Sequence, residues 1–211
     1  MNHKTAPTML CRNPTSPYPT MPTILLGFPQ SREGVGEDPL LKDLRPLLQA
    51  GGLSVLTLKL TIGEDDSVLV REMEAAVDQC ERSKLVIGGF SLGARIALRV
   101  ATRVRPTALL CLGFPFHPPG QPQAHKRTNL FVGHDIPTLI IQGARDPHGT
   151  QHEAKTYQHL PDCVQFRWIE EANHRFETRQ KSPWSRNEHL LSIANRSLEF
   201  ARQTLAWNGN V

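Results

Sequence analysis

The chain has 211 residues, of which 39% are hydrophobic and 21% are charged, and its formal net charge is +4. This length suits one domain that buries enough apolar surface to fold without disulfide bonds or a metal ion. The composition excludes a wholly disordered chain, and no apolar run approaches the roughly 18 residues that a membrane span needs. We therefore expect a soluble globular protein that does not act at a membrane.

The N-terminal segment differs from the rest of the chain. Residues 1–22 contain five prolines, and proline joins neither a helix interior nor a central strand, because it lacks a backbone N–H group. We expect residues 1–22 to form a proline-rich, disordered tail ahead of a single domain over residues 23–211. The tail has no apolar stretch typical of a secretory signal, and the four cysteines form no C-x-x-C pair. These features favour a cytoplasmic protein with reduced thiols.

Six short apolar runs follow this tail and alternate with segments of helical periodicity. The runs are almost continuously apolar, which is typical of strands buried on both faces of a parallel sheet. We therefore expect an α/β fold with a mostly parallel sheet of about six strands and helices on both faces. The runs are Thr23–Gly27, Leu53–Leu58, Leu85–Gly89, Thr107–Gly113, Pro137–Gly143 and Val164–Ile169.

The start of the first helix, in the segment Pro39–Ala50, is ambiguous. Its leucines recur at helical spacing, but Pro46 would clash with the preceding turn inside a helix. We expect the helix to begin only near Asp43, so that Pro46 falls in its first turn.

Four later helices are indicated by apolar periodicity or by capping signals. Leu69 to Cys80 and Leu92 to Val104 each place apolar residues three or four positions apart. Thr150 with Glu153, and then Ser185 with Glu188, match the capping box that opens a helix.

Three arginines, Arg95, Arg99 and Arg103, recur every four residues in the second of these periodic segments. Such a stripe can contact nucleic acid or an acidic partner. The chain has no nucleic-acid motif and no interleaved aromatic residues, however. We expect a solvated helix face and no nucleic-acid partner.

The segment 114–136 has no clear period and is rich in proline at its start. Loops of this length are usually functional or disordered, and this one follows a strand, near the edge where α/β sheets bind ligands. We expect it to form a short lid. The candidate pocket and lid residues are Phe90, Phe114, Phe116 and His117.

The most informative motif is Gly89-Phe90-Ser91-Leu92-Gly93. It reads G-x-S-x-G between an expected strand and an expected helix, which is the pattern of a nucleophile elbow. A strained turn at Ser91 would project its hydroxyl above the sheet. Gly89 and Gly93 would let the strand and the helix approach closely. The alternative is that Ser91 is merely a small residue in a tight turn.

A serine hydroxyl becomes a nucleophile only when a base removes its proton. In this arrangement an acid and then a histidine follow on loops after later strands. Asp146 comes just after Pro137–Gly143, and His174 comes just after Val164–Ile169. We therefore expect a triad of Ser91, Asp146 and His174. The alternatives are His148 as the base, and Asp162, Glu170 or Glu171 as the acid.

An oxyanion hole needs two backbone N–H donors. Leu92, which follows the nucleophile, supplies one of them in this arrangement. The second donor is expected just after the first strand, where Pro29 has no N–H group, and we expect it to be Gln30, with Phe28 as the alternative.

No cofactor is expected, and metal binding is not expected either. His148 and His152 stand four residues apart next to Glu153, but no third ligand stands in a metal-binding motif with them.

Three segments of this sequence resemble those of the α/β-hydrolase superfamily, and the resemblance extends over residues 23–206. They are Gly88–Arg95, Pro137–Asp146 and Ile169–His174. The segment Cys111–Pro119 is similar to a small dienelactone-hydrolase-related branch that includes the testis-expressed hydrolase-like proteins. The resemblance implies a minimal sheet. Dienelactone hydrolases use a cysteine nucleophile where this chain has Ser91.

We expect a serine hydrolase that cleaves small carboxylic esters or thioesters through an acyl-enzyme on Ser91. The alternative is a catalytically weak or inactive hydrolase scaffold that acts as a protein-interaction module. The substrate of the hydrolase would be a small-molecule ester or thioester. The sequence does not indicate an oligomeric state.

Overall fold

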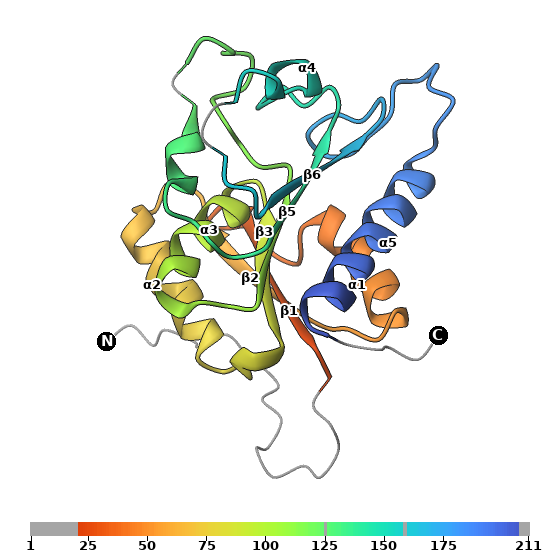
Figure 1. The fold of residues 1–211 in the computed structure, drawn as a ribbon. Coiled ribbons are helices and arrows are strands. Elements are labelled where there is room, and N and C mark those ends of the chain that lie inside the picture. The colour runs from red at the N-terminus through yellow and green to blue at the C-terminus, as the bar shows by residue number, and fades with distance from the viewer. Residues whose placement is uncertain (1–20, 125, 158–159, 207–211) are drawn as a thin grey trace.

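The computed structural model describes residues 21–206, apart from residues 125 and 158–159 (Figure 1). The tail expected over residues 1–22 therefore lies outside the described residues, except for Met21 and Pro22.

Six strands form one sheet in the order β2-β1-β3-β4-β5-β6. Every neighbouring pair runs parallel, so the expected parallel α/β sheet is confirmed. The order reverses between β1 and β3, and ligands bind at the carboxyl ends of strands beside such a reversal. The strands are β1 (Thr23–Gln30), β2 (Ser54–Thr61), β3 (Leu85–Phe90), β4 (Ala108–Leu112), β5 (Thr138–Gly143) and β6 (Val164–Ile169).

The first two strands are longer than their apolar runs. β1 and β2 remain paired from Phe28↔Lys59 to Gln30↔Thr61. This pairing depends on backbone groups and does not require apolar side chains, so the end of an apolar run does not mark the end of the strand. The extra residues of β1 bear on the site described below.

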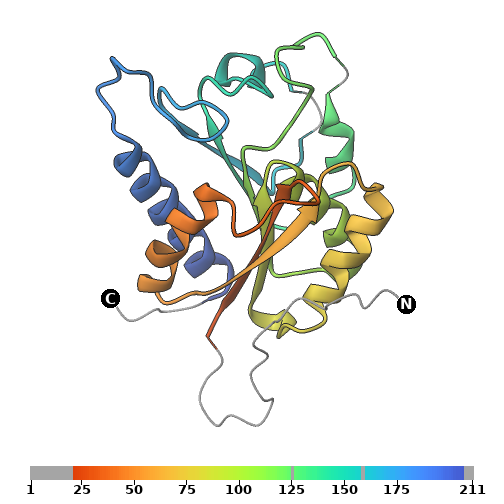
Figure 2. The same cartoon turned by 180° about the vertical axis from the view of Figure 1, so that it is seen from behind.

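Helices cover both faces of the sheet, as expected. In Figures 1 and 2, α1 and α5 lie on one face, and α2 and α3 lie on the other. Each face has its own apolar core. None of the helices in the described ranges combines the length and the apolar character of a membrane span. The helices are α1 (Pro39–Ala50), α2 (Asp66–Val77), α3 (Leu92–Val104), the short α4 (Gln151–Ala154) and α5 (Arg186–Thr204), with 3-10 turns at Arg82–Lys84 and Arg127–Phe131.

The expected start of the first helix was wrong. α1 begins at Pro39, and the side chain of Asp38 caps it by accepting a hydrogen bond of 2.9 Å from the Leu40 amide. Pro46 lies inside the helix on its exposed side, as does Lys42. Lys42 is the residue whose carbonyl loses its helical donor, so water can take the place of that donor. The buried leucines of α1 stabilise the helix despite the proline.

The arginine stripe joins two helices. Arg95 donates two hydrogen bonds to the carboxylate of Asp66 on α2, at 2.6 and 2.9 Å. Arg99 lies 3.3 Å from the same carboxylate, and Arg103 lies 3.1 Å from Glu74. The stripe is therefore a contact between α3 and α2, and not the purely solvated face that was expected.

Candidate active site

Ser91 lies at the turn between β3 and α3. Its backbone has φ 53° and ψ −112°, a region that a residue other than glycine occupies only under strain. A Cβ atom at Gly93 or Gly89 would lie 1.9 or 2.2 Å from the carbonyl oxygen of Gly27. The two glycines thus let α3 and β3 pack directly against β1, which is the close approach expected for the elbow.

Three loops at the carboxyl edge of the sheet bring Ser91, His174 and Asp146 into contact. The Nε2 atom of His174 lies 3.0 Å from the Ser91 hydroxyl, and its Nδ1 atom lies 2.8 Å from Oδ2 of Asp146. Asp146 is fully buried, and the side chain of His174 is 18% exposed. The arrangement lets His174 take the serine proton through Nε2 while its Nδ1–H group donates to the carboxylate.

Two further donors hold Asp146, and sequence reasoning missed both. Gln142 on β5 donates through Nε2 to Oδ2, and the backbone amide of His148 donates to Oδ1, each at 2.8 Å. Gln142 also donates to the carbonyl of Phe114 at 3.1 Å. The sequence offered one signal for Gln142, an amide next to the apolar run Leu139–Ile141, because an amide buried in a strand needs hydrogen-bond partners.

His148 packs against His174, with ring centroids 4.4 Å apart. Its Nδ1–H group donates to the carbonyl of His117 at 2.9 Å, so the proton of the neutral ring lies on Nδ1. Burial lowers the pKa of His148, and the nearby imidazole of His174 lowers it further. Because His174 contacts the Ser91 hydroxyl, His174 is the better placed of the two histidines to act as a base.

The loops that carry Asp146 and His174 are tied together. The side chain of Arg145 donates to the carbonyl of Glu171 at 2.7 and 3.1 Å, and its amide donates to the carbonyl of Ala172 at 3.0 Å. The carboxylate of Glu171 faces Arg145 as well, at 3.5 Å. Glu171, one of the acids considered as an alternative, thus takes part in the contact between the two loops. The acid that contacts His174 is Asp146.

Phe90 also contacts the base. Its ring is nearly fully buried and lies 4.9 Å from the ring of His174. The guanidinium of Arg175 lies 5.3 Å from the centre of the Phe90 ring and pairs with the buried Asp38 at 3.2 Å. Phe90 therefore lies beside His174, and its ring is packed in the core and does not line an open pocket.

The other candidate pocket residues lie in the core. Phe114 and Phe116 are fully buried, with ring centroids 4.8 Å apart, and Phe131 packs on Phe114 at 5.2 Å. His117 is 1% exposed and contacts Glu153 at 2.8 Å. The expectation that these residues line an open pocket was wrong, because their side chains fill the space beside α3 and α4. The segment 114–136 is anchored at both ends by this packing.

The structure argues against Gln30 as the expected donor on β1. The N–H and C=O groups of one strand residue point to the same neighbour, and this direction alternates along the strand. The carbonyl of Gln30 accepts a hydrogen bond of 2.9 Å from the amide of Ile62, which follows β2. The amide of Gln30 therefore points toward β2 as well, whereas Phe28 as the second donor stays a prediction.

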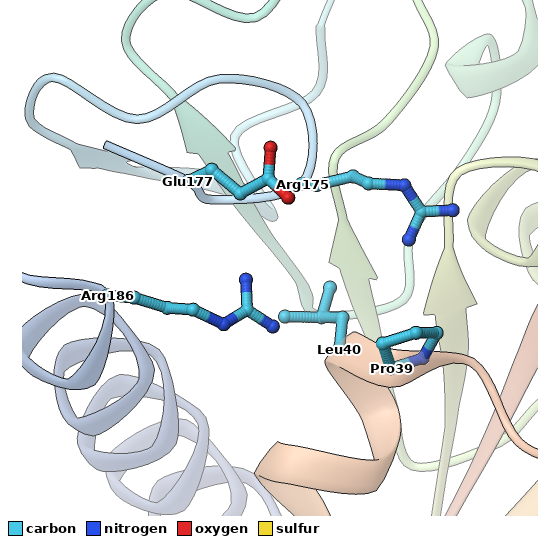
Figure 3. Close-up of a pocket in the computed structure, with 5 residues that line it drawn as sticks. All are labelled: Pro39, Leu40, Arg175, Glu177 and Arg186. Carbon is cyan, nitrogen blue, oxygen red and sulfur yellow. The ribbon is translucent and has the colours of Figure 1, made fainter. Parts of the chain in front are cut away.

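A cavity of about 430 Å³ is lined in part by Arg175, the residue after His174, and by none of Ser91, Asp146 and His174 (Figure 3). Its lining comes from three segments: the loop after β6, the start of α1 and the start of α5. Within the part of the chain that the structure describes, no three His, Cys, Asp or Glu side chains gather as metal ligands. The lining residues are Pro39, Leu40, Arg175, Glu177 and Arg186.

Comparisons with known proteins agree with this architecture. A family model described as an alpha/beta hydrolase domain matches residues 61–202. Est1E from Butyrivibrio proteoclasticus has a similar structure, with a TM-score of 0.63 and 14% identity over 89% of each chain. A dienelactone hydrolase from Anabaena variabilis has a TM-score of 0.62 and 20% identity over 87% of each chain. At these identities the likeness concerns the fold.

A curated relative matches over a shorter stretch. It is described as an "(R)-3-hydroxydecanoyl-ACP:CoA transacylase" from Pseudomonas aeruginosa and is 31% identical over 68 residues. The match covers 32% of this chain and 23% of that protein. The chain therefore spans less than a quarter of the length of this relative.

Proposed function

The chain belongs to the α/β-hydrolase family, and on that premise we propose that it is a serine hydrolase of small carboxylic esters or thioesters. The observation that carries the proposal is the hydrogen-bonded series from the Ser91 hydroxyl through His174 to Asp146. This series holds a nucleophile, a base and an orienting carboxylate in contact before any substrate binds.

The reaction proceeds in two acyl transfers. Nε2 of His174 takes the proton of Ser91 as its oxygen attacks the carbonyl carbon of the ester. The tetrahedral intermediate then collapses: the bond to the leaving group breaks, and His174 returns the proton to the alcohol or thiol that departs. Water, deprotonated by the same nitrogen, attacks the acyl-enzyme and releases the acid. Asp146 keeps the imidazole in the Nδ1–H tautomer and stabilises the imidazolium.

One feature of the site supports this chemistry. The amide of Leu92, the first residue of α3, is one of the helix N–H groups without an intrahelical partner, so it is free to donate to the developing oxyanion.

Acyl transfer is a second candidate function, favoured by the similarity to the transacylase. It shares the acyl-enzyme on Ser91 and differs in the second step, in which an acceptor alcohol or thiol replaces water. Release of product in the presence and absence of an added thiol acceptor distinguishes the two, because a transferase turns over slowly in water alone.

Labelling with a fluorophosphonate probe tests the proposal. The probe reacts with an activated serine, so we expect it to label the wild-type protein and not Ser91→Ala. The matched control Ser83→Ala removes an exposed serine away from the site and keeps the label. A panel of nitrophenyl esters of rising chain length then identifies the preferred acyl group. A folded wild-type protein that takes no label and cleaves none of these esters would favour the scaffold alternative.

A further inference from the structure

His174 lies in a short loop after β6, residues 173–177, whose two ends are hydrogen-bonded to each other. The amide of Asn173 donates to the carbonyl of Glu177 at 3.1 Å, and the amide of Phe176 donates to the carbonyl of Asn173 at 3.0 Å. The chain therefore turns out and back within five residues, with His174 inside the turn. Whatever holds this loop closed also holds the backbone of His174.

The side chain of Asn173 makes three further hydrogen bonds inside the loop. Its Oδ1 atom accepts from the amides of Arg175 and Glu177, at 2.9 and 3.0 Å. Its Nδ2 atom donates to the carboxylate of Glu177 at 3.0 Å. The contact with Arg175 is an Asx turn, in which a side-chain oxygen takes the place of a backbone acceptor. The residue before His174 thus holds the amide of the residue after it.

Phe176 anchors the far side of the same loop. Its φ is 59°, a conformation that is unfavourable for a bulky residue and persists only where the surrounding contacts hold it. Its ring is fully buried, and its carbonyl accepts a hydrogen bond of 3.0 Å from Nδ1 of the buried His189 on α5. The burial of the ring therefore offsets backbone strain that lies two residues from His174.

We propose that Asn173 is a positioning residue for His174, and that its side chain keeps the base in contact with both partners. This inference rests on the proposed hydrolase function. His174 has to maintain contacts of 3.0 Å with Ser91 and 2.8 Å with Asp146 at the same time. A shift of about 1 Å in a reacting group can cost 10²-fold in rate. Without Asn173, the loop backbone that carries the imidazole would lose three of its hydrogen bonds.

Removing these hydrogen bonds is the first test. Asn173→Ala leaves two amides of the loop without their acceptor. Water can take the place of that acceptor, so the protein should fold, but water does not hold the two amides together. We expect kcat for a nitrophenyl ester to fall by about 10- to 100-fold, with KM within about 2-fold of wild type, because the base shifts and no substrate contact is lost.

Restoring the hydrogen bonds is the second test. Asn173→Asp keeps the acceptor for both amides but places a second carboxylate against Glu177, so we expect an intermediate kcat. Combining it with Glu177→Gln reverses the roles, since the new glutamine amide can donate to the new carboxylate. We expect the double variant to recover kcat to within about 3-fold of wild type. Rates are compared on the pH-independent plateau of each variant, because the new carboxylate also favours the imidazolium.

Asp65→Ala is the matched control. Asp65 forms the same Asx contact, since its Oδ1 atom accepts from the amide of Ser67, two residues later, at 2.7 Å. It caps α2, however, and does not touch the loop of His174. We expect this variant to unfold at a lower temperature because the helix loses its cap, and to keep the wild-type kcat. Thermal unfolding of all variants separates a positioning role from a general loss of stability.

Fluorophosphonate labelling separates failure of this inference from failure of the proposed function. We expect rapid labelling of Ser91 in wild type, and labelling in Asn173→Ala that is slower by the factor by which kcat falls. If wild type is labelled but folded Asn173→Ala keeps its kcat and labelling rate within about 2-fold, the inference is overturned and the hydrolase proposal stands. A loss that the double variant does not restore also overturns the inference.

Two other outcomes are decisive. If Asn173→Ala does not fold, Asn173→Asp and the double variant carry the test, and equal kcat values in these two overturn the inference. If wild type takes no label at Ser91 and cleaves no ester, the inference and the proposed function both fail.

Discussion

Arg145 donates two hydrogen bonds to the carbonyl oxygen of Glu171, at 2.7 and 3.1 Å, and so joins the loop that carries Asp146 to the loop that carries His174. The catalytic geometry proposed above depends on the relative position of these two loops. A shift of about 1 Å in a reacting group can cost 10²-fold in rate. Arg145 is therefore expected to support activity without touching substrate.

The first prediction concerns this arginine. Arg145→Ala should lower kcat by about 10-fold or more, because the loop of His174 loses the side-chain hydrogen bonds to the loop of Asp146 and keeps only the backbone bond between Arg145 and Ala172. Arg179→Ala is the control, since Arg179 approaches the carboxylate of the same Glu171 at 3.9 Å and is 64% exposed. Steady-state kinetics on a nitrophenyl ester compares the two. Equal activities in both variants would show that the tie has no catalytic importance.

The second prediction concerns the buried amide of Gln142. Gln142→Leu leaves the carbonyl of Phe114 and one oxygen of Asp146 without this donor, so we expect a loss of about 1–3 kcal/mol in the free energy of unfolding. Urea denaturation measures this loss, and kcat should fall with it as Asp146 loses a fixed orientation. Gln49→Leu, on the exposed side of α1, should change neither. A Gln142→Leu protein of wild-type stability would contradict the hydrogen bonds described.

The third prediction concerns pH. Burial lowers the pKa of His148 and of His134 below the ordinary value of 6.5. Below about pH 6.5 the unfolded chain therefore binds more protons than the folded chain at these two histidines. The free energy of unfolding decreases as the pH falls from about 6.5 toward the lowered pKa values of the folded state. The free energy of unfolding should thus be lower at about pH 5.5 than at about pH 7.5.

A variant assigns part of this pH dependence to His148. His148→Asn can still donate to the carbonyl of His117 but does not titrate, so the difference in unfolding free energy between the two pH values should shrink. His152→Asn, at an exposed position, is the control and should leave the difference unchanged. The same pH dependence in His148→Asn as in wild type would rule out this assignment.

The fourth prediction uses the proline inside α1. Pro46→Ala restores a donor for the carbonyl of Lys42 on the exposed side of the helix and should raise the free energy of unfolding by about 1 kcal/mol or more. Pro39→Ala changes the first helical position, where no intrahelical donor is lost, so it should bring no such gain. Urea denaturation of both variants provides the comparison. No gain from Pro46→Ala would mean that the helix has adapted fully to its proline.

Local signals explain what could be predicted from the sequence. Six apolar runs predicted the sheet, because strands buried on both faces must be apolar along their whole length. Ser91 carried a motif with two glycines, and Asp146 and His174 each followed a run directly, so all three were placed at one edge of the sheet. The structure brings their side chains into contact at that edge.

The rest depends on contacts between distant segments. Arg145 contacts the site through the fold alone, and no spacing in the sequence distinguishes it. Gln142 stands out only as an amide in an apolar run, and the partners of its side chain depend on the fold. The direction of the Gln30 amide depends on which strand pairs with the end of β1, which no apolar pattern records. The burial of Phe114 and Phe116 beneath the site required the path of the segment between β4 and β5.

The proposed acyl-enzyme offers the most direct test of the account. The wild-type protein is mixed with an excess of an activated ester for a few turnovers and quenched in acid, and the peptide that contains Ser91 is analysed by mass spectrometry. We expect the mass of one acyl group on Ser91, and no such adduct in His174→Ala under the same conditions. Turnover of the ester with no adduct at Ser91, or undiminished turnover in Ser91→Ala, would contradict the proposed mechanism.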